Sequence, residues 1–113
     1  MRVRTMELPK KVRIIDQTYT IEYVGTPSEV DVFKRRTMWG HIDYWTRSIR
    51  VYAPEGHAIS DIWNTLWHEI IHGIIHGLQI NEISGLDDEE EEHVVHLLAT
   101  GINAVIHDNK FIE

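Results

Sequence analysis

The residues best suited to chemistry are the run His68-Glu69-Ile70-Ile71-His72. Two histidines four apart lie on one face of an α-helix, one turn apart, as two ligands of a divalent metal require. Glu69 lies about 100° round the helix from the first histidine, so its carboxylate can reach a water on the metal without displacing it. Catalytic zinc keeps three protein ligands and one open position. The run therefore predicts a zinc site with Glu69 as the general base.

The residues around this run favour a helix that buries its active face. Positions 65–74 contain no proline and no charged residue other than Glu69. Histidine and glutamate are poor choices for the buried side of so apolar a helix unless a metal or a partner neutralises them. The alternative is an amphipathic helix whose histidines bond to polar groups of the core.

The third ligand must come from another element. The chain has no cysteine, which excludes thiolate ligands and disulfides. Ile75 and Leu78 stand where a metzincin extension would place Gly and His, so that class is excluded. The remaining candidates are acids at the start of a second predicted helix: Glu89, Glu90, Glu91 and Glu92.

Helical phase orders these four acids. Glu92 leads into Val95, Ala99 and Ile102, which form the apolar face of that helix, so Glu92 is the first choice and Glu91 the second. Glu89 and Glu90 are more simply interpreted as solvated acids that complement the helix dipole. The alternative for the whole run is a charged helix start without a ligand.

Histidine is unusually frequent, with eight in the chain and five between positions 68 and 96. His96 lies one turn after Glu92 and is either a supporting group or a rival ligand. His76 lies one turn after His72, either at the rim of the helix or near the metal. Stabilisation of an oxyanion is open to four residues on or near the preceding strands: His41, Tyr44, Tyr52 and His57.

The elements that position these residues form an α+β pattern of strands followed by helices. Strand-like runs at 11–15 and 19–24, and at 40–45 and 48–53, predict two hairpins of a small antiparallel sheet. A short helix is expected at 28–36. Ser60 is the expected N-cap of a helix from Asp61 to about Leu78, a loop follows at 81–88, and a second helix spans 88–108.

The four tryptophans divide into two pairs. Trp63 and Trp67 lie on the predicted metal helix and are expected in the core. Trp39 and Trp45 flank a strand and could line a cleft, although a core position is favoured for them as well.

Length and charge limit the class of protein. A chain of 113 residues is expected to form one domain, residues 1–113. Its net charge of −7 argues against sequence-independent binding of nucleic acid. No apolar run approaches the roughly 20 residues that span a bilayer, and the first residues lack a signal peptide, so a cytoplasmic location without membrane contact is expected. No pattern sets the oligomeric state.

With these residues in place, the chain resembles the minimal gluzincins, small H-E-x-x-H zinc metallopeptidases of phages and prophages related to the ImmA/IrrE family. The resemblance rests on three segments: residues 40–51, residues 65–72, and Glu92-x-x-Val95-His96-x-Leu98-Ala99 beside the family's Glu-x-x-Ala-Asn-x-Phe-Ala. It implies a zincin-like fold, one zinc ion on His68, His72 and Glu92, and a host-cytoplasmic peptidase. His96 departs from the family's Asn. An extended peptide or protein substrate would add to an edge strand, expected at 48–53.

Two other functions remain open. His72-Gly73-Ile74-Ile75-His76 with Glu82 resembles the metal motif of the bacterial rRNA-maturation endoribonucleases, although that ligand set leaves His68 and Glu69 without a role. The second alternative is a catalytically silent metal-binding protein that acts through a protein partner, because a motif defines a site and not a turnover.

Overall fold

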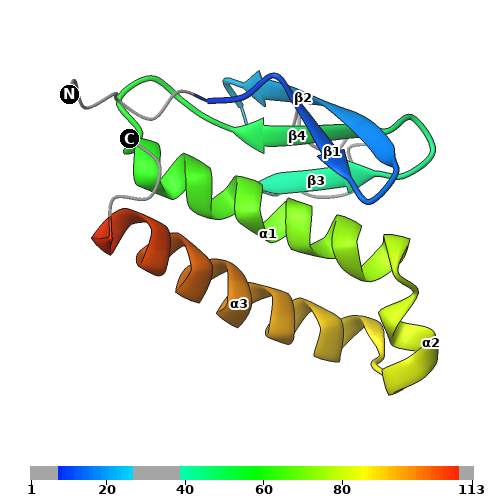
Figure 1. Ribbon diagram of the computed structural model, residues 1–113. Coiled ribbons are helices and arrows are strands. Elements are labelled where there is room, and N and C mark those ends of the chain that lie inside the picture. Colours follow the sequence, from blue (N-terminus) through cyan, green and yellow to red (C-terminus); the bar gives the residue numbers. More distant parts are fainter. Residues whose placement is uncertain (1–7, 27–38, 110–113) are drawn as a thin grey trace.

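The computed structural model describes residues 8–26 and 39–109, so the helix expected at 28–36 lies outside the described residues. The fold is α+β, with a four-stranded mixed sheet and three helices (Figure 1). The elements follow in the order β1 (Lys11–Ile14), β2 (Gln17–Val24), β3 (Gly40–Asp43), β4 (Ser48–Tyr52), α1 (Ile59–Gly77), α2 (Ile80–Ser84) and α3 (Asp88–Asp108).

Both predicted hairpins are confirmed, but the sheet that they form is not purely antiparallel. β1 pairs with β2 and β3 with β4 in antiparallel fashion. β2 and β4 are parallel, with Ile21 opposite Ile49. The expectation of an antiparallel sheet is therefore wrong at this central pair. The alternation within each strand fixes which face is buried, but it does not encode how one hairpin docks on the other.

The strand expected at the edge of the sheet lies inside it. The order is β1-β2-β4-β3, so β4 has a neighbour on both sides and β1 and β3 are the edges. Ile49 and Val51 of β4 are fully buried, as befits a central strand. An edge and a central strand of a one-sided sheet show the same alternation, which is why the pattern at 48–53 did not distinguish them.

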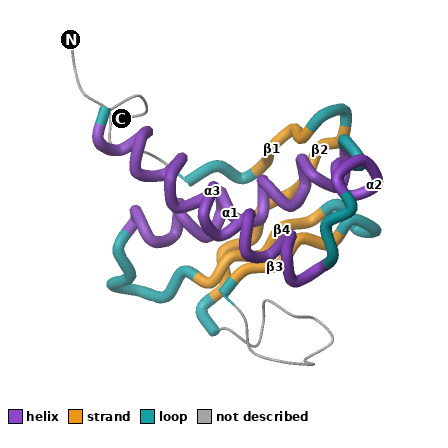
Figure 2. The backbone as a smooth tube through the Cα atoms, turned by 90° about the horizontal axis from the view of Figure 1, so that it is seen from below, coloured by secondary structure: helices purple, strands orange, loops and turns teal. Residues whose placement is uncertain are grey.

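α1 is the middle of three layers. The sheet covers one of its sides and α3 the other, as Figure 1 shows, and in Figure 2, seen from below, the two long helices overlap. Leu66 of α1 belongs to a core shared with the sheet, and Ile71 belongs to a second cluster against α3. That second cluster is completed by Ile75, Val95 and Ala99. The helix that carries the chemical motif is thus held from two sides.

α1 lies very close to the sheet at Gly73. A Cβ atom there would be 2.8 Å from Cδ1 of Ile14 and 3.1 Å from Cδ1 of Ile42. Both isoleucines are buried and have little room to yield. Glycine at position 73 therefore sets the depth at which the motif helix rests on the sheet.

The start of α1 differs from the predicted start, whereas the start of α3 agrees with the prediction. α1 begins at Ile59 with Ala58 as its N-cap and no capping side chain, so the expectation of Ser60 as N-cap is wrong by two residues. α3 begins at Asp88 as predicted, behind a capping box of Asp87 and Glu90. α2 occupies part of the expected loop at 81–88 and ends at Gly85, where φ is 73°.

The tryptophans confirm one pair of predictions and correct the other. Trp63 is buried and Trp67 is partly buried against the core, as expected. Trp39 is 60% exposed and Trp45 is 94% exposed, so the core position favoured for both is wrong. Trp45 sits in the turn after β3, because Asp43 Oδ1 accepts hydrogen bonds from the backbone N–H groups of Trp45 and Thr46 and ends the strand. Within 8–26 and 39–109, no helix is long and apolar enough to cross a membrane.

Candidate metal centre

His68 and His72 project from the same face of α1 into an open cleft. Their Nε2 atoms are 3.3 Å apart, and their side chains are 19% and 13% exposed. The cleft has a volume of about 1000 Å³. Residues of β3 form one wall, α1 forms the floor, and the beginning of α3 forms the other wall. The two histidines are therefore shielded but reachable.

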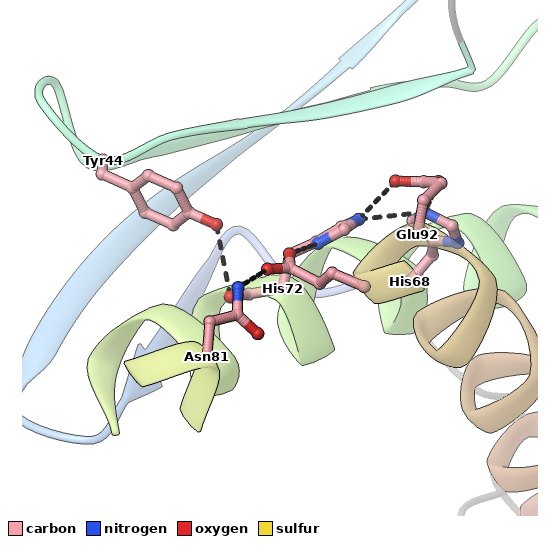
Figure 3. Close-up of polar contacts among 6 residues, drawn as sticks. Tyr44, His68, His72, Asn81 and Glu92 are labelled. Carbon is pink, nitrogen blue, oxygen red and sulfur yellow. Dashed lines mark hydrogen bonds and ion pairs between the residues drawn. The ribbon is translucent and has the colours of Figure 1, made fainter. Parts of the chain in front are cut away.

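Glu92 of α3 completes the cluster. Its Oε1 lies 2.6 Å from Nε2 of His68, and its Oε2 lies 2.9 Å from Nε2 of His72 (Figure 3). Ligand atoms of the three residues all lie within 4.8 Å of one another, and they form the one such group of three among the described residues. Four tetrahedral ligands about 2.0–2.2 Å from zinc are roughly 3.3–3.6 Å apart. The two nitrogens meet this spacing, and the carboxylate is slightly closer.

The hydrogen bonds of His72 direct a lone pair into this cluster. Nδ1–H of His72 donates to Oε2 of Glu91 at 2.5 Å, which leaves Nε2 facing His68 and Glu92. The other oxygen of Glu91 accepts a hydrogen bond from Nδ2 of Asn81. In the metal-free protein a proton on an imidazole nitrogen can bridge it to the Glu92 carboxylate as a hydrogen bond, and a bound cation would take the place of such a proton.

The protonation of His68 also suits a metal ligand. Burial lowers the pKa of His68, and this effect outweighs the opposite influence of the Glu92 carboxylate. A neutral imidazole keeps the lone pair that a metal requires. The donor set of two imidazoles and one carboxylate is the kind that binds zinc, so the residues present fit that ion.

Glu69 lies apart from the three converging groups and deep in the protein. It is 6% exposed and is the one buried charged side chain among the residues described. Its carboxylate accepts a hydrogen bond from the backbone N–H of Ile42. Gly40 lies directly against it, since a Cβ atom at position 40 would be 2.9 Å from Oε2 of Glu69. The β3 backbone thus fixes the carboxylate beside the histidines.

Burial raises the pKa of Glu69 to about 8, with a further contribution from the nearby Glu92 carboxylate, and the Ile42 hydrogen bond opposes the rise only in part. In the metal-free protein this carboxyl group therefore takes up and releases a proton near neutral pH, as a general acid–base does.

The other residues singled out in the sequence have distinct places. The Tyr44 hydroxyl donates to the backbone carbonyl of His72 at 3.2 Å, and its ring stacks on His76 at 3.8 Å. His76 is therefore engaged with Tyr44 and is absent from the group of three converging ligands. His41, His57 and His96 line the cleft with Tyr44, whereas the ring of Tyr52 packs beside Trp39. Glu82 is exposed on α2.

No protein-family model matches the chain. Comparisons with curated proteins and with solved structures find no match either.

The sequence did not predict the roles of two residues that support the metal centre, Glu91 and Asn81. Glu91 was the second choice for the third ligand, but its side chain orients His72 instead. Asn81 was placed in a loop, although α2 carries it to Glu91. Helical phase gives Glu91 and Glu92 neighbouring directions about 100° apart, and only the path of the chain through α2 decides which of the two meets which nitrogen.

Replacing Glu91 with Gln is expected to weaken zinc binding by roughly 10–100-fold, because an amide aligns and polarises the His72 ring less well than a carboxylate. Asn81→Ala should weaken binding by less, since it removes a support of Glu91 and not of the ring. The matched control is Glu90→Gln, which removes the same charge one residue away and preserves a capping box. Competition with a chromophoric chelator measures all three, and equal affinities for Glu91→Gln and Glu90→Gln would contradict the assignment.

In metal-free protein, Glu69→Gln is expected to raise the free energy of unfolding, by an amount that grows as the pH rises from about 4.5 to about 8. The folded protein keeps Glu69 protonated up to a pH of about 8 and the unfolded chain only to about 4.5. Unfolding therefore becomes easier as the pH rises through this window, and Gln does not share the penalty. The gain should be on the order of 3 kcal/mol at pH 7 and vanish below pH 4.5. Urea melts of chelator-treated protein across this range measure it, and a gain that does not vary with pH would refute it.

Proposed function

We propose that this chain is a zinc-dependent peptidase that hydrolyses a peptide bond in the cleft between β3 and α3. The observation that carries the proposal is the buried Glu69 carboxylate beside the converging His68, His72 and Glu92 side chains. Burying a carboxylate costs several kcal/mol. A site that only binds a metal does not need an additional, buried carboxylate beside its ligands. A general base, in contrast, requires a carboxylate whose pKa lies near the working pH.

His68, His72 and Glu92 would hold one zinc ion, with Glu91 fixing the ring of His72. When bound, zinc acts as a Lewis acid toward water and toward the substrate carbonyl. Glu69 takes the proton of the attacking water and returns it to the leaving amine. The β3 backbone at Gly40 and Ile42 keeps the Glu69 carboxylate in place. The chemistry corresponds to that of the gluzincins, which the chain resembles in sequence.

β3 is the strand that supports substrate binding in this proposal. It is an edge of the sheet, and its residues Gly40, His41 and Ile42 line the cleft. An extended peptide can pair with such an edge through main-chain hydrogen bonds and lie across the metal centre. The sequence placed substrate binding on the strand at 48–53. That strand, β4, is paired on both sides, so β3 takes its place in the proposal.

The ribonuclease-like alternative has less support. Its ligand set of His72, His76 and Glu82 does not converge among the residues described, and His76 stacks on Tyr44 instead. The cleft is also lined by acids, which repel a phosphate backbone.

The test has two parts, metal content and hydrolysis. Purified protein is expected to hold about one zinc per chain, and a chelator should lower its melting temperature because zinc binds only the folded state. Zinc-loaded protein incubated with a mixture of peptides in H₂¹⁸O should yield cleaved products with ¹⁸O in their new carboxylates. Protein that binds zinc but cleaves none of the peptides would overturn the peptidase proposal and support the metal-binding alternative.

A further inference from the structure

A group of aromatic rings, one of them exposed, borders the cleft at the end where α1 begins. Trp39 lies 5.0 Å from Tyr52 and 6.1 Å from the stacked ring of His57, measured between centroids. Trp39 is 60% exposed, and it lines the cleft together with His57. We call Trp39, Tyr52 and His57 the aromatic cluster. A tryptophan this exposed gains little from folding, so its surface is available to a ligand.

The aromatic cluster lies close to the reacting groups. Trp39 immediately precedes Gly40, whose backbone is in near contact with the Glu69 carboxylate. An extended peptide advances about 3.3 Å per residue. A substrate side chain within one or two positions of the scissile bond therefore reaches the Trp39 ring when the peptide lies along β3.

Among the described residues that line the cleft, the side chains with a formal charge are all acidic. Asp61 lines the cleft from the first turn of α1, four residues after His57. Asp88 and Glu89 line the opposite wall, and no lysine or arginine among the described residues lines this cleft. A low-dielectric cleft lined by acids concentrates cations and excludes anions.

We infer that the aromatic cluster and Asp61 form a subsite for the side chain of a lysine or arginine in the substrate, next to the scissile bond. The inference rests on the proposed function for its place in the reaction. The aliphatic stem of such a side chain lies on the Trp39 ring, and its cationic end faces both that ring and the Asp61 carboxylate. An apolar side chain gains the ring contact alone, and an acidic side chain meets repulsion.

Binding to zinc-loaded Glu69→Gln protein tests this subsite without turnover. The probes are capped pentapeptides of alanine that carry one variable residue at each position in turn: Arg, Lys, norleucine, Phe or Glu. At one position the Arg and Lys peptides should bind roughly three- to thirty-fold more tightly than the norleucine peptide, which has a similar apolar stem and no charge. The Glu peptide should bind least tightly, and added salt should reduce the preference.

Variants locate the preference in the cleft. Trp39→Ala and Asp61→Asn should each remove most of it, whereas Trp39→Phe, which keeps an aromatic face, should retain part of it. Trp45→Ala is the matched control, because Trp45 is 94% exposed and does not line the cleft. Equal effects of Trp39→Ala and Trp45→Ala would overturn the inference. So would norleucine or Phe peptides that bind as tightly as the basic ones, or basic peptides that do not bind.

The two proposals fail in different ways. If basic peptides bind through Trp39 and Asp61 but zinc-loaded wild-type protein does not cleave them, the peptidase proposal fails and the subsite stands. If wild-type protein cleaves peptides without any preference for lysine or arginine beside the cut, the subsite fails and the peptidase proposal stands.

Discussion

Zinc-loaded Glu69→Gln protein is expected to lose peptide hydrolysis by roughly 10²–10⁴-fold while retaining its metal, because general-base catalysis contributes about that much. Gln has nearly the same shape as Glu and can still accept the hydrogen bond from the backbone of Ile42, but it cannot take a proton from water. The loss should appear in kcat, with little change in KM, since Glu69 is buried beneath the cleft.

The matched control for this variant is Glu82→Gln, which removes one negative charge at an exposed position on α2. It should leave both kcat and zinc content near wild type. Hydrolysis by Glu69→Gln at the wild-type rate would show that Glu69 is not the base. A variant that lost its zinc as well as its activity would instead point to a structural defect at the floor of the cleft.

The second large effect concerns the ligands. His68→Ala, His72→Ala and Glu92→Ala should each weaken zinc binding by well over the roughly 100-fold that marks the limit for a supporting group, because each removes one of three protein ligands. At a fixed excess of zinc, the stabilisation against unfolding by the metal should fall accordingly. Chelator competition and thermal melts with and without zinc measure the two quantities.

His96→Ala and Glu82→Ala separate the competing sites. His96 lines the cleft one turn beyond Glu92 but is not among the three converging groups, so its loss should cost far less affinity than that of Glu92. Glu82→Ala should bind zinc as wild type does. Equal losses for His96→Ala and Glu92→Ala would make His96 a direct ligand, and a loss confined to Glu82→Ala would restore the ribonuclease-like site.

The sequence predicted the motif helix, the ligand helix and both hairpins well, because each is encoded by a local repeat. The i, i+4 spacing of His68 and His72 and the apolar face behind Glu92 require no knowledge of the rest of the chain. The convergence of these three side chains follows once two helices pack on their apolar faces, and the structure brings them together as the sequence predicted.

What the sequence did not predict depends on contacts between distant segments. The parallel pairing of β2 with β4 and the edge position of β3 arise from how two hairpins dock. The role of Glu91 depends on where α2 carries Asn81. Gly40 carries no side chain to reveal its function, and its contact with Glu69 appears only when β3 is set against α1.

The attachment of α3 has a thermodynamic consequence for a chain without cysteine. The buried centre of the contact between α1 and α3 consists of two side chains from each helix, and α2 joins the two helices, so the start of α3 is held at the metal centre. An ion shared by His72 and Glu92, 20 positions apart, closes a loop in the chain as a disulfide would. For a covalent cross-link of this span, the loss of freedom in the unfolded chain corresponds to about 3 kcal/mol. The ion would then act as a cross-link in addition to its role in catalysis. The concentration of free zinc would therefore control the stability of the folded chain as well as its activity.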